Sequence, residues 1–418
     1  MGWSSAARDQ GTFCFSCHTA VPYALARPSL RTALAEAAPT AAERRLMEDV
    51  RQRVRLWNAT RPFYTDQRNG PGKSAQSRGT EAVLSALMLA WDDARSARLS
   101  AETRAALDHM WAVQQASGPD RGAWAWLDFN LAPWEVPDAQ YYGAALAALA
   151  VAVAPQDYRS IPQVQDPLQL LREYLARNYP AQSLHHRLVL LWASTRLAGL
   201  LSSEQRQALI EAALRGQNPD GGWSLSALVS PSSRRGELLR DAASDGYATG
   251  LATLVLEQAA MPRALEAVRH GRSWLVRNQR GHGGLWIRGQ EGFWVTHSLN
   301  KRRNPSSNVG LFMSDAATAY AVLALTRSPG VERPNPVPTP RGRAARPLQT
   351  QAPRPQALVQ GPIDSHVSLE RPVVEIHRVA DPRRIVSLQC QLAFLEPECA
   401  RELDRGHDPN EQRTRVRR

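Results

Sequence analysis

Two kinds of helical segment alternate along residues 11–328, and this internal repeat limits the possible fold more than any other feature of the chain. Segments of the first kind consist of small apolar residues with hardly a charge, which predicts helices that are buried on most sides. They begin at Thr80, Asp138, Leu184, Ser244 and Ser314.

Segments of the second kind are amphipathic and carry helix start signals. A Ser, Thr or Asp before a helix can accept a hydrogen bond from an exposed backbone N–H group, and proline is favoured in the first turn. The expected starts are the capping boxes Thr40/Glu43 and Ser202/Gln205, and then Ser100, Asp166–Pro167 and Pro262. Each segment predicts a helix with one apolar and one solvated face.

The alternation predicts an all-α fold in which two concentric rings of helices form an (α/α)6 toroid. If HTAVPYALA, residues 18–26, begins the first inner helix, six inner and five outer helices can be counted. The missing outer helix belongs before Cys14. We therefore expect the toroid to be incomplete at the N-terminus, the lost segment holding an outer helix and room for an export signal.

The composition changes near residue 329. Of the 29 prolines, 13 fall in residues 329–418, and apolar periodicity vanishes there. A segment of this composition buries too little apolar surface to fold, so we expect a low-complexity, mostly disordered tail that is rich in proline and arginine. The expected domains are a toroid over residues 1–328, which includes the segment 11–31 that opens the first inner helix, and this tail.

The formal net charge of +12 does not by itself indicate an anionic partner. Only Lys73 and Lys301 are lysines, the arginines are scattered and no nucleic-acid-binding motif stands out, so we expect no nucleic acid partner. The longest apolar run, residues 143–155, is shorter than the roughly 20 residues of a transmembrane helix, so no membrane span is predicted. The start, MGWSSAARDQ, lacks the basic and apolar regions of a signal peptide.

Three connections from amphipathic to apolar segments share a pattern. They read QQASGPDRGAW, QNPDGGW and QRGHGGLW, which places Gln115, Gln217 and Gln279 at helix ends and Trp124, Trp223 and Trp286 after a glycine. The pattern resembles the Gln-to-Gly-x-Trp repeat of the squalene-hopene cyclase and prenyltransferase superfamily, and the resemblance covers about residues 80–328. It implies a terpenoid cyclase-like toroid in which the repeats have a structural role.

The resemblance does not extend to the chemistry of that superfamily. In squalene-hopene cyclases an Asp-x-Asp-Asp motif supplies the acid, and the motif is absent from this sequence, where Asp92 and Asp93 lie at the end of their helix. A prenyltransferase-like zinc site needs a cysteine among the later inner helices, whereas Cys390 and Cys399 lie in the tail.

Three acidic residues lie at or next to the starts of apolar segments, namely Asp138, Asp245 and Asp315. The simplest interpretation is that they cap helices, because aspartate is favoured at that position. In a cyclase-like enzyme without the Asp-x-Asp-Asp motif, Asp245 and Asp315, and then Asp138, would be the candidate catalytic acids.

Residues 14–18, CFSCH, match the sequence that attaches haem c covalently. The thiols of Cys14 and Cys17 add to the vinyl groups, and His18 then binds the haem iron from one face. A Cys14–Cys17 disulfide or a pair of small buried side chains are the structural alternatives, and a zinc site lacks a second pair of ligands. The segment CxSCHTxxPYxLARPxLR is also similar to one in cyclase-like toroids of environmental bacteria that carry a c-type haem signature.

Loop lengths predict that this motif lies at the mouth of the barrel. The connections over residues 118–137, 218–243 and 280–313 are long, and all three lead into apolar segments. Because long loops usually mark the functional face, the mouth is expected where the inner helices begin, and the haem motif lies at the start of the first of them.

Four histidines are candidates for the second face of the iron. His282 and His297 lie in the last long connection, next to the expected mouth, and His185 and His186 begin the opposite inner helix. The opposite wall is the more distant of the two, so the loop histidines are the stronger candidates.

Three functions remain open. The first is a toroid with haem c at its mouth that exchanges electrons with a redox partner protein or oxidises a hydrophobic small molecule held in the barrel. The second is a terpene or squalene cyclase-like isomerase, and the third is a non-catalytic toroid that binds a partner. Haem attachment implies a periplasmic or otherwise exported protein, and the substrate and the oligomeric state are not indicated.

Overall fold

The computed structural model describes residues 19–155, 157–229, 241–281, 292–300 and 308–326. Within these ranges the chain is mostly α-helical, and its strands, β1 (Arg280–Gly281) and β2 (Gly292–Phe293), form one short antiparallel pair. The fold class is therefore all-α, as the sequence predicts.

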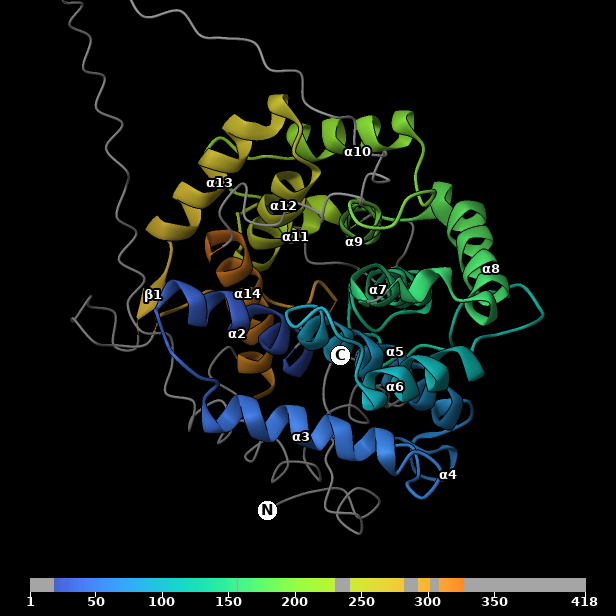
Figure 1. Ribbon diagram of the computed structural model, residues 1–418. Coiled ribbons are helices and arrows are strands. Elements are labelled where there is room, and N and C mark those ends of the chain that lie inside the picture. Colours follow the sequence, from blue (N-terminus) through green and yellow to red (C-terminus); the bar gives the residue numbers. More distant parts are fainter. Residues whose placement is uncertain (1–18, 156, 230–240, 282–291, 301–307, 327–418) are drawn as a thin grey trace, which may run out of the picture. The chain divides into compact units, whose positions relative to one another are not determined.

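Six helices are buried on most sides, in keeping with their small apolar residues. They are α2 (Ala20–Ala33), α5 (Lys73–Asp93), α7 (Gln140–Val153), α9 (Leu184–Ser194), α12 (Gly246–Ala259) and α14 (Asn308–Thr326). In this order each helix packs against the next, and α14 packs against α2, so that the contacts form a closed cycle (Figure 1). Small residues permit the close approach, since a Cβ atom on Gly250 of α12 would lie 2.7 Å from the backbone nitrogen of Ala321 in α14.

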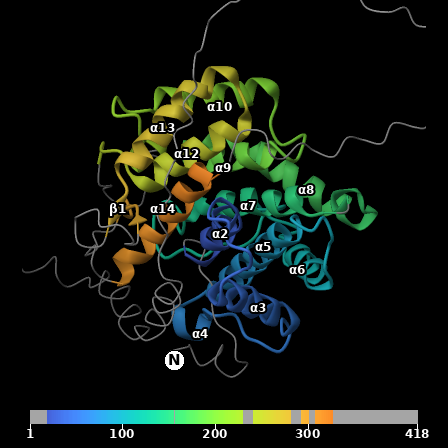
Figure 2. The ribbon, with the colours of Figure 1, turned by 60° about the vertical axis from the view of Figure 1, so that its left-hand side comes forward.

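Five amphipathic helices alternate with the buried ones along the described chain. They are α3 (Ala41–Arg55), α6 (Ala101–Ala112), α8 (Pro162–Asn178), α10 (Ser203–Arg215) and α13 (Leu265–Arg277). Figures 1 and 2 show α8, α10 and α13 on the outer side of α7, α9 and α12. Short helical segments in the connections are α4 (Asp66–Asn69), η1 (Pro137–Ala139), η2 (Tyr158–Ser160), η3 (Tyr179–Ala181), α11 (Leu225–Leu228) and η5 (Pro262–Ala264).

Both predicted capping boxes are present. The hydroxyl of Thr40 accepts a hydrogen bond from the backbone N–H of Glu43, and the Glu43 carboxylate accepts one from the backbone N–H of Thr40. Ser202 and Gln205 repeat this arrangement before α10, and Ser100 caps α6. These bonds satisfy backbone donors that have no partner inside the helix, which explains why the start signals in the sequence are reliable here.

Two predicted helix starts are wrong, in addition to that of α14, which is described from Asn308 and not from Ser314. Helix α8 begins at Pro162 and not after Asp166–Pro167, because a proline in the first turn loses no backbone hydrogen bond and Ile161 before it has the extended conformation of a cap. Helix α5 begins at Lys73 and not at Thr80. Its first two turns, KSAQSRG, are polar, so the apolar pattern used to find the helix did not include them.

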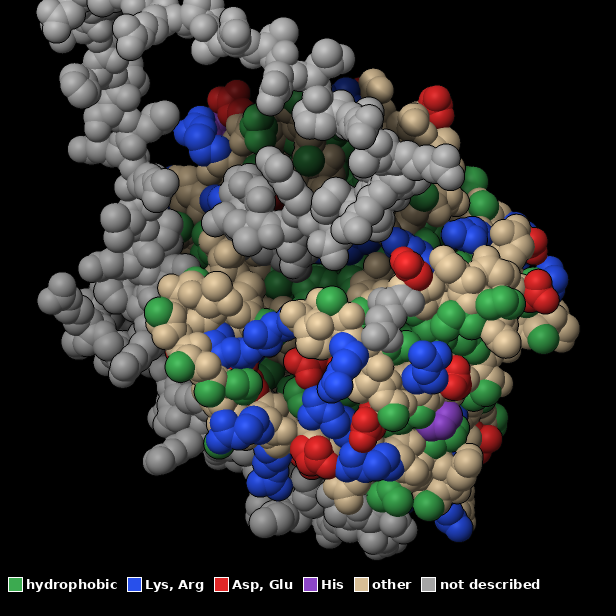
Figure 3. Space-filling view, viewed as in Figure 1, with side chains coloured by type: hydrophobic (Ala, Val, Ile, Leu, Met, Phe, Trp, Pro, Cys, Tyr) green, Lys and Arg blue, Asp and Glu red, His purple; other side chains and the backbone are tan. Residues whose placement is uncertain are grey.

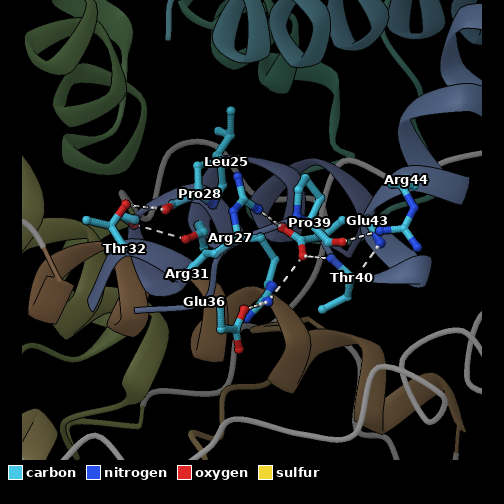
Figure 4. A network of polar contacts seen from close by, with 12 residues as sticks. Leu25, Arg27, Pro28, Arg31, Thr32, Glu36, Pro39, Thr40, Glu43 and Arg44 are labelled. Carbon is cyan, nitrogen blue, oxygen red and sulfur yellow. Dashed lines mark hydrogen bonds and ion pairs between the residues drawn. The ribbon is translucent and has the colours of Figure 1, made fainter. Parts of the chain in front are cut away.

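Buried ion pairs join α2 to α3 (Figure 4). Arg27 and Arg31 lie one turn apart on α2, and both guanidinium groups donate to the carboxylate of Glu43 on α3, Arg27 at 3.1 Å. Glu36 in the connection accepts a further bond from Arg27. Burial opposes the ionisation of Glu43, but the N–H group of Thr40 and the two arginines lower its pKa overall. The first buried helix is thus anchored to its amphipathic neighbour.

Charged side chains of both signs are interspersed on the face drawn in Figure 3. Surface ion pairs are one reason: Arg55 on α3 pairs with Glu48 on the same helix and, at 3.3 Å, with Glu102 on α6. Exposed pairs of this kind contribute little to stability, about 1 kcal/mol at most.

A search of the described helices for a membrane-spanning segment finds none with the required length and hydropathy. The expected tail, residues 329–418, lies outside the described residues, and so does the segment before Thr19 in which the missing outer helix was expected.

Candidate functional site

Aromatic side chains from alternate members of the helix cycle meet in the interior. Trp91 on α5, Trp192 on α9 and Tyr320 on α14 are buried, and their rings contact each other edge to face. The ring centroids are 5.6 Å apart for Trp91 and Trp192 and 6.3 Å apart for Trp192 and Tyr320. Since these three helices are not neighbours in the cycle, the rings reach across the interior and occupy it at this level.

A second aromatic group lies against the first. Tyr247, the second residue of α12, packs edge to face on Tyr320 with ring centroids 5.1 Å apart, and on Trp134 from the connection before α7 at 5.0 Å. The indole N–H of Trp134 donates to the Tyr247 hydroxyl at 3.0 Å. The same hydroxyl lies 2.7 Å from Nε2 of His185 on α9. The oxygen atom of Tyr247 therefore joins three elements of the fold.

Two consecutive histidines follow the cap Ser183 at the start of α9, and both are buried. Nδ1 of His186 lies 3.1 Å from the side-chain oxygen of Gln182, and its Nε2 lies 3.2 Å from the carbonyl oxygen of Pro133. Both partners are acceptors, so a neutral ring donates to only one of them at a time. Nδ1 of His185, in contrast, has no hydrogen-bond partner.

Burial keeps both imidazole rings neutral. It lowers the pKa of His185 well below the ordinary value, and the neighbouring His186 acts in the same direction. It also lowers the pKa of His186, against the opposing effects of the Asp138 carboxylate and the Pro133 carbonyl group. At neutral pH the Nε2 atom of His185 can therefore accept a hydrogen bond from the hydroxyl of Tyr247.

Two connections that are far apart in the sequence bond to each other beside Trp134. The side chain of Asn300 accepts from the backbone N–H of Ala132 at 3.0 Å and donates to the carbonyl oxygen of Asn130 at 2.8 Å. The hydroxyl of Ser298 donates to the carbonyl oxygen of Ala132 at 3.3 Å. These bonds hold the connection that brings Trp134 to Tyr247.

Asp245 caps α12, as the simpler interpretation predicts. Its Oδ1 atom accepts from the backbone N–H groups of Tyr247 and Ala248 and from the hydroxyl of Thr296, all within 3.0 Å, and its Oδ2 atom accepts from the N–H of Leu225 at 2.6 Å. Burial raises the pKa of Asp245 to about 6 although these bonds favour the charged form. The carboxylate is thus engaged in joining α12 to α11 and to the segment after β2.

Asp315 does not cap α14. The helix is described from Asn308, so the predicted start at Ser314 is wrong and Asp315 lies beyond the first turn. Its Oδ2 atom is buried without a hydrogen-bond partner, and burial raises its pKa to about 7 against the opposing effect of the Thr19 side chain. Near neutral pH, Asp315 is a better proton donor than Asp245.

Asp138 lies in η1, directly before α7. Neither this turn nor α7 begins with a side-chain cap, so the capping interpretation is wrong for Asp138. The half-buried carboxylate instead acts through its charge. This charge raises the pKa of His186, against the effect of burial, and raises the pKa of Tyr174, in the same direction as burial.

Tryptophans of the sequence repeat cover the ends of amphipathic helices. The indole N–H of Trp124 donates to the carbonyl oxygen of Met110 at the end of α6, at 2.6 Å. That of Trp223 donates to the carbonyl oxygen of Ala213 at the end of α10, at 2.7 Å. Carbonyl groups in the last turn of a helix have no partner within it, so the indoles replace the missing donors.

In the third repeat Trp294 takes this position. The indole N–H of Trp294 donates to the carbonyl oxygen of Leu275 near the end of α13, at 2.8 Å. The Gly-x-Trp pattern is therefore found at residues 292–294, separated from Gln279 by a longer stretch than in the other repeats. Trp286 itself lies outside the described residues.

Glutamine side chains tie the loops of the first two repeats to the amphipathic helix that follows. Gln217 donates to two carbonyl oxygens at 2.9 Å, that of Gly221 in its own loop and that of Ala267 on α13. Gln114 makes the equivalent pair of bonds, at 3.0 Å, to its own loop and to α8, so the predicted Gln115 is displaced by one residue. Each bond pair fixes a loop on the amphipathic helix that follows.

The predicted haem-binding residues lie outside the described residues. These are Cys14, Cys17 and His18, and the chain continues from them into Thr19, which precedes α2. Within the described ranges, no group of three or more His, Cys, Asp or Glu side chains is arranged to hold a metal ion.

Two of the four candidate histidines are enclosed in the interior. The rings of His185 and His186 are wholly buried among aromatic side chains. The side chain of His297, after β2, is 41% exposed, and its Nε2 atom lies 3.9 Å from a carboxylate oxygen of Asp241. It therefore remains accessible. His282 lies outside the described residues.

The aromatic groups of the interior were not identified from the sequence. They are Trp91, Trp134, Trp192, Tyr247 and Tyr320. For the four that lie on helices, the available signal was a large aromatic residue in a run of mostly small apolar residues, because such a run leaves little room for large side chains except toward the interior. No protein-family model and no curated protein matches the chain.

Proposed function

We propose that residues 1–328 form an (α/α)6 toroid like those of the squalene-hopene cyclase and prenyltransferase superfamily. The closed cycle of six buried helices and the five amphipathic helices that alternate with them support this architecture. The bonds of Gln114 and Gln217 to the next amphipathic helix add to the support. Residues 329–418 form a disordered tail in this proposal.

The proposed toroid carries haem c where its first inner helix begins. The observation that carries this assignment is continuity: the spacing of Cys14, Cys17 and His18 is that of a haem attachment motif, and the motif runs directly into Thr19 and α2. The two thiols would hold the haem through its vinyl groups and His18 would bind the iron, which would supply one-electron redox chemistry. His297 is our candidate for the second face because its ring is exposed.

Electron transfer is the activity that the interior favours. Trp91, Trp192 and Tyr320 lie in contact across the helix cycle, so aromatic side chains occupy the interior where a cyclase would hold its substrate. Electrons would pass between the haem and a redox partner protein in the periplasm or another exported compartment. The haem could also oxidise a hydrophobic small molecule, and that molecule would have to bind elsewhere in the barrel.

The experiment is to export the complete chain together with a haem c maturation system and to record its visible spectrum. We expect a spectrum that changes reversibly when the protein is reduced with dithionite and reoxidised with ferricyanide. The matched control is the Cys14→Ser/Cys17→Ser double variant, which should retain its helical circular dichroism and lack the spectrum. A folded but colourless wild-type protein overturns the haem proposal.

One observation favours the second candidate function, a cyclase-like isomerase. Burial raises the pKa of Asp315 to about 7, so its carboxyl group can donate a proton near neutral pH. Incubation with squalene or a prenyl diphosphate, followed by mass spectrometry of the products, tests this candidate, and Asp315→Asn should abolish any product. A colourless protein that converts neither compound would leave the third function, a toroid that binds a partner.

A further inference from the structure

We propose that Tyr247 is a redox-active residue whose phenolic proton passes to His185, and that Tyr320, Trp192 and Trp91 conduct the electron away from it. The inference deepens the proposed electron transfer and rests on that function for its biological use. The residues that form the path are all described, and its test does not require haem.

Every step of the electron path is a ring contact in the buried interior. Tyr247 contacts Tyr320 at a centroid distance of 5.1 Å, Tyr320 contacts Trp192 at 6.3 Å, and Trp192 contacts Trp91 at 5.6 Å. Tyrosine and tryptophan are the aromatic side chains that lose an electron most easily, so an electron vacancy can move between rings in contact. The path crosses from α12 through α14 and α9 to α5.

The far end of the path reaches the helix that follows the proposed haem motif. The indole N–H of Trp91 donates to the carbonyl oxygen of Leu25 on α2 at 3.2 Å. Trp91 is 8% exposed, whereas Trp192 and Tyr320 are more deeply buried, so the path runs from the enclosed Tyr247 toward the outer part of this aromatic group. An electron leaving Tyr247 is thereby brought to α2.

A proton acceptor is already in place at the near end. The Tyr247 hydroxyl lies 2.7 Å from Nε2 of His185 and accepts the indole N–H of Trp134 at 3.0 Å. Because Trp134 supplies a donor and the buried His185 is neutral, the phenolic hydrogen can point to Nε2, which places the imidazole hydrogen on Nδ1. An oxidised phenol is a far stronger acid than imidazolium, so transfer of the proton to His185 is favourable.

The atoms and charges of this step balance. Tyr247 loses one electron through Tyr320 and its O–H bond breaks, which leaves a neutral tyrosyl radical. The proton forms a new N–H bond at Nε2 of His185, which becomes a cation. The electron is taken up by a metal-centred oxidant of high potential, and the oxidation state of its metal falls by one. Reversal of both transfers restores the phenol and the neutral imidazole.

A purely structural role accounts poorly for His185. Its ring is fully buried and its Nδ1 atom has no hydrogen-bond partner. Burial of an unpaired polar group lowers stability, and an apolar side chain at this position would avoid that loss. The Tyr247 hydroxyl accepts from Trp134 and needs only an acceptor for its own hydrogen, which a side-chain amide could supply as well as an imidazole.

The experiment generates the oxidant with light. Photo-oxidised ruthenium tris(bipyridine), with a cobalt(III) quencher, is applied to the full chain, and the radical is detected by electron paramagnetic resonance with and without ring-deuterated tyrosine. We expect a tyrosyl signal that is lost in Tyr247→Phe. The matched control is Tyr141→Phe, which removes a buried phenol that donates to the carbonyl oxygen of Leu175 at 3.1 Å outside the path, and it should keep the signal.

A second variant separates proton transfer from packing. His185→Gln retains a hydrogen-bond acceptor near Tyr247 but cannot take up a proton, so the radical yield should fall while circular dichroism stays unchanged. The inference is overturned if Tyr247→Phe and Tyr141→Phe give the same signal as the wild type, or if His185→Gln leaves the radical yield unchanged.

This experiment can fail or succeed independently of the haem proposal. The same measurement on the Cys14→Ser/Cys17→Ser double variant uses a chain that cannot attach haem. A Tyr247 radical in this variant supports the redox site even where haem is absent, whereas a coloured wild-type protein without a Tyr247 radical supports haem attachment and contradicts the path.

Discussion

The indole N–H of Trp294 donates to the carbonyl oxygen of Leu275 at 2.8 Å and so closes the end of α13. Replacement by phenylalanine leaves this buried carbonyl oxygen without the donor, so Trp294→Phe should lower the free energy of unfolding by about 1–3 kcal/mol. Urea unfolding followed by circular dichroism measures the change. Trp286→Phe is the matched comparison, and a larger loss for Trp286→Phe than for Trp294→Phe would return the repeat to its predicted position.

The glycine of the first repeat touches the next amphipathic helix. A Cβ atom on Gly122 would lie 2.1 Å from the carbonyl oxygen of Leu170 on α8, and the backbone φ of Gly122 is +97°. Gly122→Ala should therefore lower the free energy of unfolding by about 4 kcal/mol or more. Gly118 in the same loop also has a positive φ but no atom within 4 Å of its Cβ position. Gly118→Ala should cost only about 1–2 kcal/mol, and equal losses in chemical denaturation would show that contact with α8 is unimportant.

The carboxylate of Glu43 balances two buried guanidinium groups. Glu43→Gln leaves Arg27 and Arg31 without this charge, so unfolding should become easier by about 3–5 kcal/mol. Glu36→Gln removes a partner of Arg27 whose side chain is 34% exposed, and its effect should stay within about 1 kcal/mol. Thermal and urea unfolding of the two variants measure both losses. A loss for Glu43→Gln no larger than that for Glu36→Gln would show that Glu43 acts only through the capping box and not by balancing the two guanidinium charges.

The raised pKa of Asp315 makes stability depend on pH. The folded value is about 7 and the ordinary value is 3.8, so the folded chain holds a proton that the unfolded chain has lost. Stability from this group is present at low pH and is lost as the pH rises through the folded pKa. Between about pH 6 and about pH 8 the loss should be about 1.4 kcal/mol. Asp315→Asn should remove this slope in urea unfolding, and an unchanged slope would contradict the burial of the charge.

The sequence predicted which segments form buried helices and which form amphipathic ones, because residue composition and helix caps decide this locally. Segments rich in alanine and leucine became the buried helices, and the Thr40 and Ser202 caps marked the starts of amphipathic ones. The start of α8 was misjudged where two prolines, Pro162 and Pro167, both offered a plausible first turn. The role of Trp294 was missed because extra residues before Gly292 hide the repeat.

The aromatic interior depends on information that sequence spacing does not contain. Trp91, Trp192 and Tyr320 meet only because three non-neighbouring helices are rotated so that each directs one ring toward the others. The contact of Tyr247 with Trp134 further depends on a loop held by distant hydrogen bonds. Helical periodicity marks the buried face of each helix but not the partners it meets there.

Haem attachment is tested most directly by the intact mass of the purified, exported chain under denaturing conditions. Thioether bonds survive denaturation, so the proposal predicts a mass that exceeds the polypeptide by one haem, and a mass without this increment for the Cys14→Ser/Cys17→Ser double variant. A wild-type chain that is folded and was produced with an active maturation system, yet has the mass of the polypeptide alone, would contradict the proposal.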